Sequence, residues 1–499
     1  MKKTILSLKK DKIKTIIAAS EVVPFAKTGG LADVAGALPA FLEEHGTEVV
    51  VIMPYYSLVK KGKFKVRSTG KTFHVKIGAH SFVGEFIEAD ITKKSKIYFI
   101  KNDKLYDRAN LYVDDEGKDY PDNLERFIFY SRAVLEFMKI FNFKADVIHC
   151  NDWQSGLVPA YLKTVLHKDP FYQKVATVFT IHNLAYQGIF KHSEFAKTGL
   201  PHDVFSINGI EFYGDMNLLK SGLVYSDILN TVSEKYAQEI QTEDYGCGLN
   251  GVLSYRKDDL YGILNGVDYN VWSPEKDAHL EKRYSLRTLS GKEECKKSLI
   301  KKYKLKISPE QPLLGTISRL ADQKGFDILL DAMEIIVKLG VGFVLLGTGD
   351  PVYHKRFAEI AEQYSDRIGV RLMFNNELAH QIEAGCDMFL MPSRYEPCGL
   401  NQIYSLKYGT VPIVRATGGL DDTIENYNRE SGKGNGFKFE RYSPVSLIAK
   451  ILEAINLYDD KKHWKKIVQN GMKQDFSWDV SASKYVKLYK RAIDKLKNK

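Results

Sequence analysis

Short apolar runs alternate with longer helical patterns along most of the chain. Runs of this length are typical of strands buried on both faces, and the periodic stretches between them favour helices. Such alternation predicts α/β domains with parallel sheets. The candidate strands of the first half are residues 13–18, 49–53, 147–149, 175–181 and 228–232, and those of the second half are residues 313–317, 343–346, 371–374, 388–391 and 411–414. A further strand is expected at residues 261–264.

The pattern changes at two places. Between residues 64 and 100 apolar and polar positions alternate with period two, which predicts an antiparallel insertion. Periodicity is weakest and charge most dense between residues 268 and 308, and we place a hinge just before this stretch, near residue 260. A chain of 499 residues is too long for one core. The expected division is an N-terminal domain over residues 1–260, a C-terminal domain over residues 261–476, and a last helix over residues 477–499 that crosses back to the first domain.

Composition is that of an ordinary globular protein, with 44% apolar and 27% charged residues. The formal net charge of +10 comes largely from lysine-rich stretches. We interpret these stretches as solvated helix faces and termini rather than as a nucleic-acid site. The positive balance would still attract a small anionic substrate.

Cysteine usage and hydropathy indicate the compartment. The five cysteines show no Cys-x-x-Cys pair and no metal-binding spacing, which points to a reducing cytoplasm. The N-terminal apolar stretch is too short for a signal peptide, and no run approaches the roughly eighteen apolar residues of a membrane span. We therefore expect a cytoplasmic protein that binds neither nucleic acid nor a membrane.

The sequence Thr-Gly-Gly-Leu-x-Asp occurs twice, at residues 28–33 and 417–422. Each copy lies between an apolar run and a helical segment. A glycine pair there lets the backbone approach a ligand closely and leaves N–H groups at a helix N-terminus for an anion. Lys27 adds a cation to the first copy. Either copy alone could be a tight turn without a ligand, whereas two copies in two halves favour a ligand between the halves.

Polar segments follow several predicted strands, where open α/β sheets place their ligands. His182 and Asn183 follow one such strand, and Asp152 follows another. A lone histidine can equally be a structural residue. Arg319 and Lys324, five residues apart after the strand at 313–317, could converge on a diphosphate, or could be surface cations. If they bind a diphosphate leaving group, losing either should cost roughly 2–4 kcal/mol of barrier.

Glu396 follows the predicted strand at 388–391, where Pro397 and Gly399 would hold it at a fixed corner. A carboxylate there can bind sugar hydroxyls or offset positive charge at an anomeric carbon. The second glycine loop lies about one βα unit further on, so both should line one edge of a sheet. No Asp-x-Asp occurs in the chain, although metal-dependent nucleotide-sugar enzymes usually carry such hard oxygen ligands. We expect no metal and no cofactor, with cations and helix ends taking the metal's place.

These residues, in this order, resemble the bacterial glycogen synthase and plant starch synthase family, which are retaining glucosyltransferases of the GT-B fold. The resemblance extends over nearly the whole chain. The matching segments are residues 27–34, 105–108, 122–127, 152–153, 182–190, 265–268, 318–325, 347–350, 396–400, 417–421 and 476–478.

The resemblance implies two Rossmann-like, doubly wound domains that face each other across a deep cleft and close about a hinge. It implies transfer of glucose from ADP-glucose to the non-reducing-end 4-hydroxyl of an α-1,4-glucan, such as glycogen or maltooligosaccharides, with retention. The protein would be a monomer or a weak homo-oligomer. The choice of ADP-glucose rests on the resemblance alone, and a related enzyme that uses UDP-glucose or another acceptor is the alternative.

The resemblance also assigns roles to residues. The expected catalytic residues are Glu396, His182, Lys27, Arg319 and Lys324. The expected donor-binding residues are Lys27, Gly29, Gly30, Asn183, Arg319, Lys324, Glu396, Cys398, Gly399, Leu400, Thr417, Gly418 and Gly419. Asp33, Tyr106 and Asp152 are expected to contact the acceptor or the sugar.

Two features qualify the resemblance. Asn151 and Gln154 stand where the family often has histidine, and about ten N-terminal residues precede the usual start. Retention requires either a covalent glucosyl-enzyme or a front-face substitution in which the leaving phosphate helps to deprotonate the acceptor. Glu396 alone would qualify as a nucleophile, so the sequence favours the front-face route.

Overall fold

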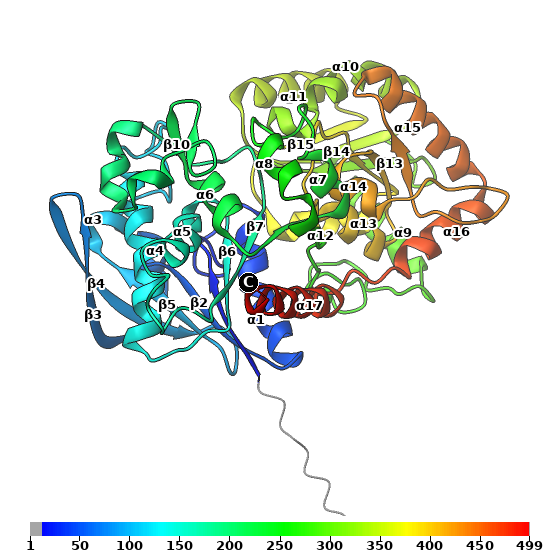
Figure 1. Cartoon of the computed structure of the whole chain (residues 1–499). Coiled ribbons are helices and arrows are strands. Elements are labelled where there is room, and N and C mark those ends of the chain that lie inside the picture. The colour runs from blue at the N-terminus through cyan, green and yellow to red at the C-terminus, as the bar shows by residue number, and fades with distance from the viewer. Residues whose placement is uncertain (1–11, 499) are drawn as a thin grey trace, which may run out of the picture. The chain divides into compact units, whose positions relative to one another are not determined.

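The computed structural model describes residues 12–498. They form two compact units, which are considered separately (Figure 1). Unit 1 contains the described residues up to Val232, then Ala237–Ile263 and the residues from Trp478 onward. Unit 2 contains Ser233–Tyr236 and Leu264–Ser477. The last helix therefore belongs to unit 1, and the main division of the chain follows Ile263.

Unit 1 is built on a nine-stranded sheet in the order β12-β11-β7-β6-β1-β2-β5-β4-β3. Adjacent strands from β12 to β5 run parallel, while β4 pairs antiparallel with both β5 and β3. The β3–β4 hairpin lies where period-two alternation predicts an antiparallel insertion. The strands are β1 (Ile13–Ala18), β2 (Thr47–Pro54), β3 (Arg67–Ile77), β4 (His80–Asp90), β5 (Lys96–Lys101), β6 (Val147–Asn151), β7 (Ala176–Ile181), β11 (Ile228–Thr231) and β12 (Leu260–Gly262).

The helices of unit 1 include a C-terminal one, α17, that packs on α1 and on β7. Figure 1 shows α17 beside α1. The helices are α1 (Gly30–Glu44), α2 (Ser57–Lys61), α3 (Asp103–Tyr106), α4 (Asn123–Ile140), α5 (Leu157–Lys163), α6 (Leu218–Tyr225), α7 (Glu234–Glu239, which begins in unit 2), α8 (Asn250–Tyr255), α17 (Trp478–Lys497) and the 3₁₀ helices η1 (Trp153–Ser155), η2 (His192–Thr198), η3 (His202–Val204) and η4 (Lys257–Asp259). A small antiparallel sheet contains β8 (Ile189–Phe190), β9 (Glu211–Phe212) and β10 (Asp215–Asn217).

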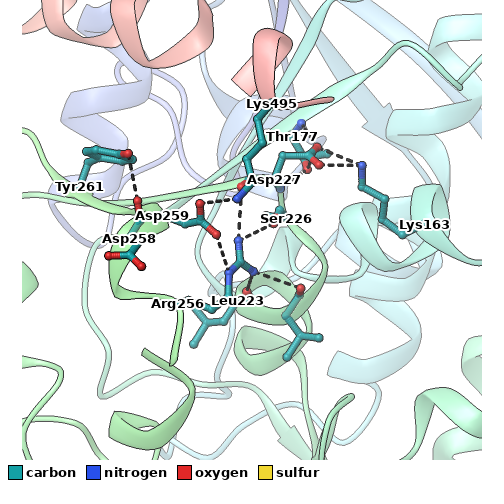
Figure 2. A network of polar contacts seen from close by, with 11 residues as sticks. Lys163, Thr177, Leu223, Ser226, Asp227, Arg256, Asp258, Asp259, Tyr261 and Lys495 are labelled. Carbon is teal, nitrogen blue, oxygen red and sulfur yellow. Dashed lines mark hydrogen bonds and ion pairs between the residues drawn. The ribbon is translucent and has the colours of Figure 1, made fainter. Parts of the chain in front are cut away.

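A polar network fixes the end of α6 and the end of α17 within unit 1 (Figure 2). The Arg256 guanidinium donates hydrogen bonds to the carbonyl oxygens of residues 223, 224, 226 and 227, at distances of 2.7 to 3.3 Å. It also pairs with Asp259 at 3.0 Å, and Asp259 in turn receives the Lys495 ammonium from α17. A helix leaves its last carbonyl groups without intrahelical partners, so Arg256 satisfies groups that would otherwise be unpaired.

Unit 2 is built on a six-stranded, all-parallel sheet in the order β15-β14-β13-β16-β17-β18. Its strands are β13 (Leu313–Ile317), β14 (Gly342–Leu346), β15 (Ile368–Arg371), β16 (Met388–Met391), β17 (Val411–Arg415) and β18 (Phe437–Phe439). Its helices are η5 (Asp322–Lys324), α9 (Ser290–Tyr303), α10 (Phe326–Lys338), α11 (Pro351–Gln363), α12 (Asn376–Gly385), α13 (Asn401–Tyr408), α14 (Gly418–Thr423), α15 (Pro444–Asp459) and α16 (Lys461–Met472).

Local capping explains where two of these helices begin. The Asp350 carboxylate accepts the Val352 amide at 2.7 Å, and Pro351 occupies the first turn of α11. Ser443 caps α15 in the same way, with Pro444 next to it. A short polar cap followed by proline is a strong start signal because proline needs no amide partner there.

One predicted strand is wrong. Residues 371–374 were expected to form a strand, but β15 ends at Arg371, where its partner β14 also ends. The apolar run that follows lies in a loop, with the Phe374 side chain 83% exposed. Leu372 still packs against the core of unit 2 from this loop, so the hydrophobic run continues beyond the strand and placed the predicted strand too late.

All six strands of unit 2 are parallel, so their carboxyl ends lie along one edge of the sheet. The order reverses at β13, which lies between β14 and β16. Ligands of open α/β sheets bind beside such a reversal. The predicted α/β fold class is confirmed in both units, and this edge is where the predicted residues of unit 2 should be sought.

Candidate functional site

The first glycine loop of unit 1 is held by a buried carboxylate. Glu21, which is 4% exposed, accepts hydrogen bonds from the backbone amides of Thr28 and Gly29, the latter at 3.0 Å. Its other oxygen accepts the Thr28 hydroxyl at 2.6 Å and the Tyr112 hydroxyl at 2.8 Å. The amides of this loop were predicted to bind a ligand anion. That prediction is wrong for Thr28 and Gly29, because their amides already donate to the Glu21 carboxylate.

The glycines of this loop face open space. A Cβ added at Gly29 or at Gly30 would meet no atom within 4 Å. Gly29 has an extended backbone (φ −142°), and α1 begins directly after it. Neither turn geometry nor packing demands glycine here, so the absence of side chains leaves the loop surface accessible, as a closely approaching ligand would need.

Lys27 and Asp33, both predicted site residues, form an ion pair next to this loop. The Lys27 ammonium lies 2.7 Å from Asp33 Oδ1, and the lysine side chain is half exposed. Burial raises the pKa of the Asp33 carboxyl, although the Lys27 charge works in the opposite direction. The ion pair holds the Lys27 ammonium beside the loop. A ligand with more negative charge than Asp33 could compete for this ammonium.

His182 and Asp152 lie together at the carboxyl ends of β7 and β6. Asp152 Oδ1 accepts the His182 backbone amide at 2.7 Å. Burial lowers the pKa of His182 to about 3, so its imidazole is neutral at physiological pH. Burial raises the pKa of Asp152 to about 7. Asp152 also has a backbone φ of +52°, a strained conformation for a residue with a side chain, and such strain is concentrated at functional sites.

Two further predicted residues of unit 1 differ in accessibility. Asn183 is partly exposed and accepts the Ala185 amide at 3.1 Å, which fixes the turn after His182. Tyr106 is fully buried, and its hydroxyl donates to the Arg126 carbonyl at 2.7 Å. The expectation that Tyr106 contacts a sugar is therefore wrong in this conformation, because its ring packs within the core and its polar atom has a protein partner.

Lys324 and Glu396 come together at the carboxyl edge of the unit 2 sheet. The Lys324 ammonium lies 2.6 Å from Glu396 Oε2, which also accepts the Ser393 hydroxyl at 3.2 Å. The Glu396 side chain is only 7% exposed, whereas that of Lys324 is 21% exposed. Glu396 is thus a buried carboxylate with a fixed orientation, and the more exposed Lys324 places a positive charge beside it.

Arg319 follows β13 at the same edge and is exposed. Among residues 12–498, no described ion pair includes its guanidinium. The structure therefore brings Lys324 and Glu396 into direct contact. It leaves Arg319, which follows β13, as an accessible cation.

The second glycine loop differs from the first because packing requires its glycines. Gly418 has φ +45°, and a Cβ there would lie 2.0 Å from the Glu396 carbonyl oxygen. A Cβ at Gly419 would lie 2.0 Å from the Cys398 carbonyl oxygen, and the Gly419 amide donates to Glu396 O at 3.2 Å. Thr417, before them, is buried. The Gly419 amide was expected to bind a diphosphate but is used internally, so this loop holds the backbone of Glu396 in position.

The other predicted residues of this segment shape the same corner. Burial raises the pKa of the Cys398 thiol to about 12, so the thiol stays protonated. Gly399 adopts φ +69°, in the left-handed region that favours glycine. Leu400 is the N-cap residue of α13. These residues turn the chain from β16 into α13 and fix Glu396 at the turn.

Sequence reasoning missed two residues that hold the first glycine loop, and it assigned a third residue to a strand. Glu21 and Tyr112 hold the first loop, and Phe374 presents an exposed ring beyond β15. A carboxylate eight residues before a glycine loop carries no periodic signal. The apolar run around Phe374 was visible in the sequence but was assigned to a strand.

No three His, Cys, Asp or Glu residues within residues 12–498 gather closely enough to hold a metal ion. Of the described helices, none is long and apolar enough to cross a membrane.

Two parallel α/β units, with cations, a neutral histidine and a buried carboxylate at strand ends, have the architecture of a GT-B glycosyltransferase. Residues 14–255 match the family model described as "Starch synthase catalytic domain", and residues 298–474 match "Glycosyl transferases group 1". The chain is 46% identical to a glycogen synthase of Thermosipho africanus over 97% of this chain and 100% of that one. It is 44% identical to a glycogen synthase of Thermotoga maritima with the same coverage. The chain belongs to the glycogen synthase and starch synthase family.

Solved structures agree with this assignment. The catalytic domain of starch synthase IV from Arabidopsis thaliana, bound to ADP and acarbose, superposes with a TM-score of 0.87 at 31% identity, covering 97% of this chain and 99% of that one. Sucrose-phosphate synthase from Thermosynechococcus elongatus, at 16% identity and a TM-score of 0.60 over 96% and 99% of the two chains, shares the fold. The predicted family and the GT-B fold class are confirmed.

Proposed function

We propose that this protein transfers glucose from ADP-glucose to the non-reducing-end 4-hydroxyl of an α-1,4-glucan, with retention at the anomeric carbon. The observation that carries the proposal is the Lys324–Glu396 pair at 2.6 Å at a sheet edge. It occurs in a chain that is 44 to 46% identical to glycogen synthases over nearly its whole length. The related plant structure with ADP and acarbose supports an adenine nucleotide and a glucan-like sugar as ligands.

Arg319 and Lys324 would bind the diphosphate of the donor. As the glycosidic bond breaks, negative charge grows on the leaving phosphate, and cations placed beside it stabilise that charge. Lys324 has three N–H donors, so it can keep Glu396 and still bind a phosphate oxygen. Arg319 is exposed and offers a planar donor fork that matches phosphate oxygens.

Phe374 would supply a face for the base. Its ring is 83% exposed at the carboxyl end of β15, two strands from β13 in the sheet. An exposed aromatic ring is suited to stack on a nucleobase. Stacking favours the larger purine only modestly, so the preference for adenine over uracil rests on family membership rather than on this ring.

His182, Asp152 and Lys27 would contact the glucosyl and phosphate groups of the donor. The imidazole of His182 is neutral, so it would act as a hydrogen-bonding partner of a hydroxyl rather than as a general acid. Glu396 is tied to Lys324 and Ser393, which lowers its availability as a nucleophile. We therefore favour front-face substitution, in which the leaving phosphate oxygen takes the proton of the acceptor hydroxyl as the new bond forms. A glucosyl adduct trapped on Glu396 would refute that route.

Donor competition tests the proposal. Transfer to glycogen should be fastest from ADP-glucose when ADP-, UDP- and GDP-glucose are compared under the same conditions. No metal or cofactor is proposed, so the rate should persist in excess chelator. A preference for UDP-glucose would favour the alternative, a related GT-B enzyme, and absence of transfer from any of the three would reject the proposed reaction.

A further inference from the structure

His182 has a hydrogen-bonding partner that determines which of its ring nitrogens carries the proton. His182 Nε2 lies 2.9 Å from Asn151 Oδ1, and both side chains are buried. Asn151 is the last residue of β6, and His182 follows β7, which pairs with β6. The contact therefore rests on two neighbouring strands rather than on a mobile loop.

The orientation of the Asn151 amide is fixed by its other contacts. Its Nδ2 group donates to the carbonyl oxygen of Ala18 at 3.1 Å and to that of His149 at 3.2 Å. A carbonyl oxygen only accepts, so the amide nitrogen must face these two groups. The amide oxygen is then directed at His182, and a hydrogen bond there requires a proton on His182 Nε2.

The state of the second ring nitrogen follows. A neutral imidazole has one N–H donor and one acceptor nitrogen. Burial keeps the His182 ring neutral, since it lowers the pKa to about 3. With the proton on Nε2, Nδ1 has a free lone pair and can accept a hydrogen bond but cannot donate one.

We propose that Asn151 is a positioning residue that holds His182 as the Nε2–H tautomer, so that Nδ1 accepts a hydrogen bond from a hydroxyl of the transferred glucose. The inference rests on the proposed function for the identity of the sugar, while the tautomer itself does not depend on it. The amide oxygen of Asn151 always accepts, so the chemistry of the amide fixes the direction of its hydrogen bond with His182.

The tautomer can be measured directly in the full-length protein labelled with ¹⁵N-histidine. The two ring nitrogens of a neutral histidine have well-separated shifts, and the His182 signals are assigned as those lost in His182→Gln. We expect the protonated shift at Nε2 and the unprotonated shift at Nδ1, unchanged from neutral to mildly acidic pH. A protonated Nδ1 would overturn the inference even if glucosyl transfer is normal.

Activity provides the second readout. Asn151→Leu removes the acceptor and should lower kcat/KM for the donor by about tenfold, the loss of one hydrogen bond, with KM for glycogen unchanged and mixed His182 tautomers. Asn151→His should restore both the tautomer and most of the rate. Asn230→Leu is the matched control, because Asn230 is a buried amide on β11 that hydrogen-bonds the Thr180 hydroxyl on the neighbouring strand β7. Equal losses in Asn151→Leu and Asn230→Leu, with the tautomer retained, would refute the positioning role.

Loss of folding and failure of the proposed function remain distinguishable from failure of this inference. If Asn151→Leu does not fold, the wild-type shifts and the Asn151→His variant still decide the tautomer. If the protein shows the predicted tautomer but transfers no glucose, the proposed function fails and the positioning of His182 stands.

Discussion

Replacement of Glu21 tests how the first glycine loop is held. The two carboxylate oxygens of Glu21 have different kinds of partner: one accepts the fixed backbone amides of Thr28 and Gly29, and the other accepts hydroxyls of Thr28 and Tyr112, which can rotate. In Glu21→Gln the amide oxygen can take the first position, and the hydroxyls can turn to accept from the new NH₂ group. In Glu21→Leu no acceptor remains for either backbone amide.

The magnitudes follow from these contacts. Hydrogen bonds to a charged acceptor contribute about 1.5–3 kcal/mol and neutral ones about 0.5–1.5 kcal/mol. Glu21→Gln changes the acceptor of two backbone hydrogen bonds from a charged to a neutral group, which lowers the stability of the loop by about 2 kcal/mol. Removal of a buried charge partly offsets this loss. Glu21→Leu leaves two donors unpaired at about 1–3 kcal/mol each. The loop is exposed, so it can open to water, and the cost should appear as local opening rather than as global unfolding.

Hydrogen exchange and transfer kinetics measure this effect. In Glu21→Leu we expect faster amide exchange at residues 28–30, displacement of Lys27, and at least a tenfold fall in kcat/KM for the donor, with little change in the unfolding midpoint. Glu21→Gln should lie between this variant and the wild type. Wild-type exchange and activity in Glu21→Leu would show that Glu21 does not hold the loop.

Three further predictions concern the stability of the two units. Gly418→Ala should destabilise unit 2 by about 2 kcal/mol or more and displace Glu396, because Cβ would collide with a carbonyl at φ +45°. Gly29→Ala, in open space, should leave the melting temperature unchanged, and equal shifts in the two variants would contradict the packing argument. Arg256→Ala should lower the free energy of unfolding by about 2–4 kcal/mol, since it leaves carbonyls at the end of α6 unpaired. Denaturant unfolding measures the free energy of unfolding of Arg256→Ala. A change within about 0.5 kcal/mol, as at an ordinary surface site, would rule out this role of Arg256.

The pKa of Asp152 is raised from 3.8 to about 7, so the folded state holds a proton that the unfolded state releases. Stability from this group should therefore fall as pH rises from about 4 to 7 and level off above that range. Asp152→Asn should remove this part of the pH dependence in melting curves. Parallel curves for the variant and the wild type would show that Asp152 is ionised when folded.

Local patterns in the sequence predicted much of the fold. The alternation of apolar runs and helical segments identified parallel α/β sheets in both halves, and the predicted strands at 313–317 and 388–391 coincide with β13 and β16. The strand ends carrying His182, Arg319 and Glu396 were also found in this way. These predictions succeed because strand burial and helix periodicity are encoded by neighbouring residues, and parallel strands place their carboxyl ends at one edge.

The tertiary structure decided which polar groups are already paired. The sequence shows two nearly identical glycine loops, but one is open and held by Glu21, while the other is packed against the backbone of Glu396. The Tyr106 hydroxyl is paired with a carbonyl oxygen twenty residues away, and the tautomer of His182 depends on Asn151, thirty-one residues away. Burial and hydrogen-bond partners are set by contacts between distant segments, and no local period records them, so the sequence indicates where chemistry can occur and the fold determines which atoms are available for it.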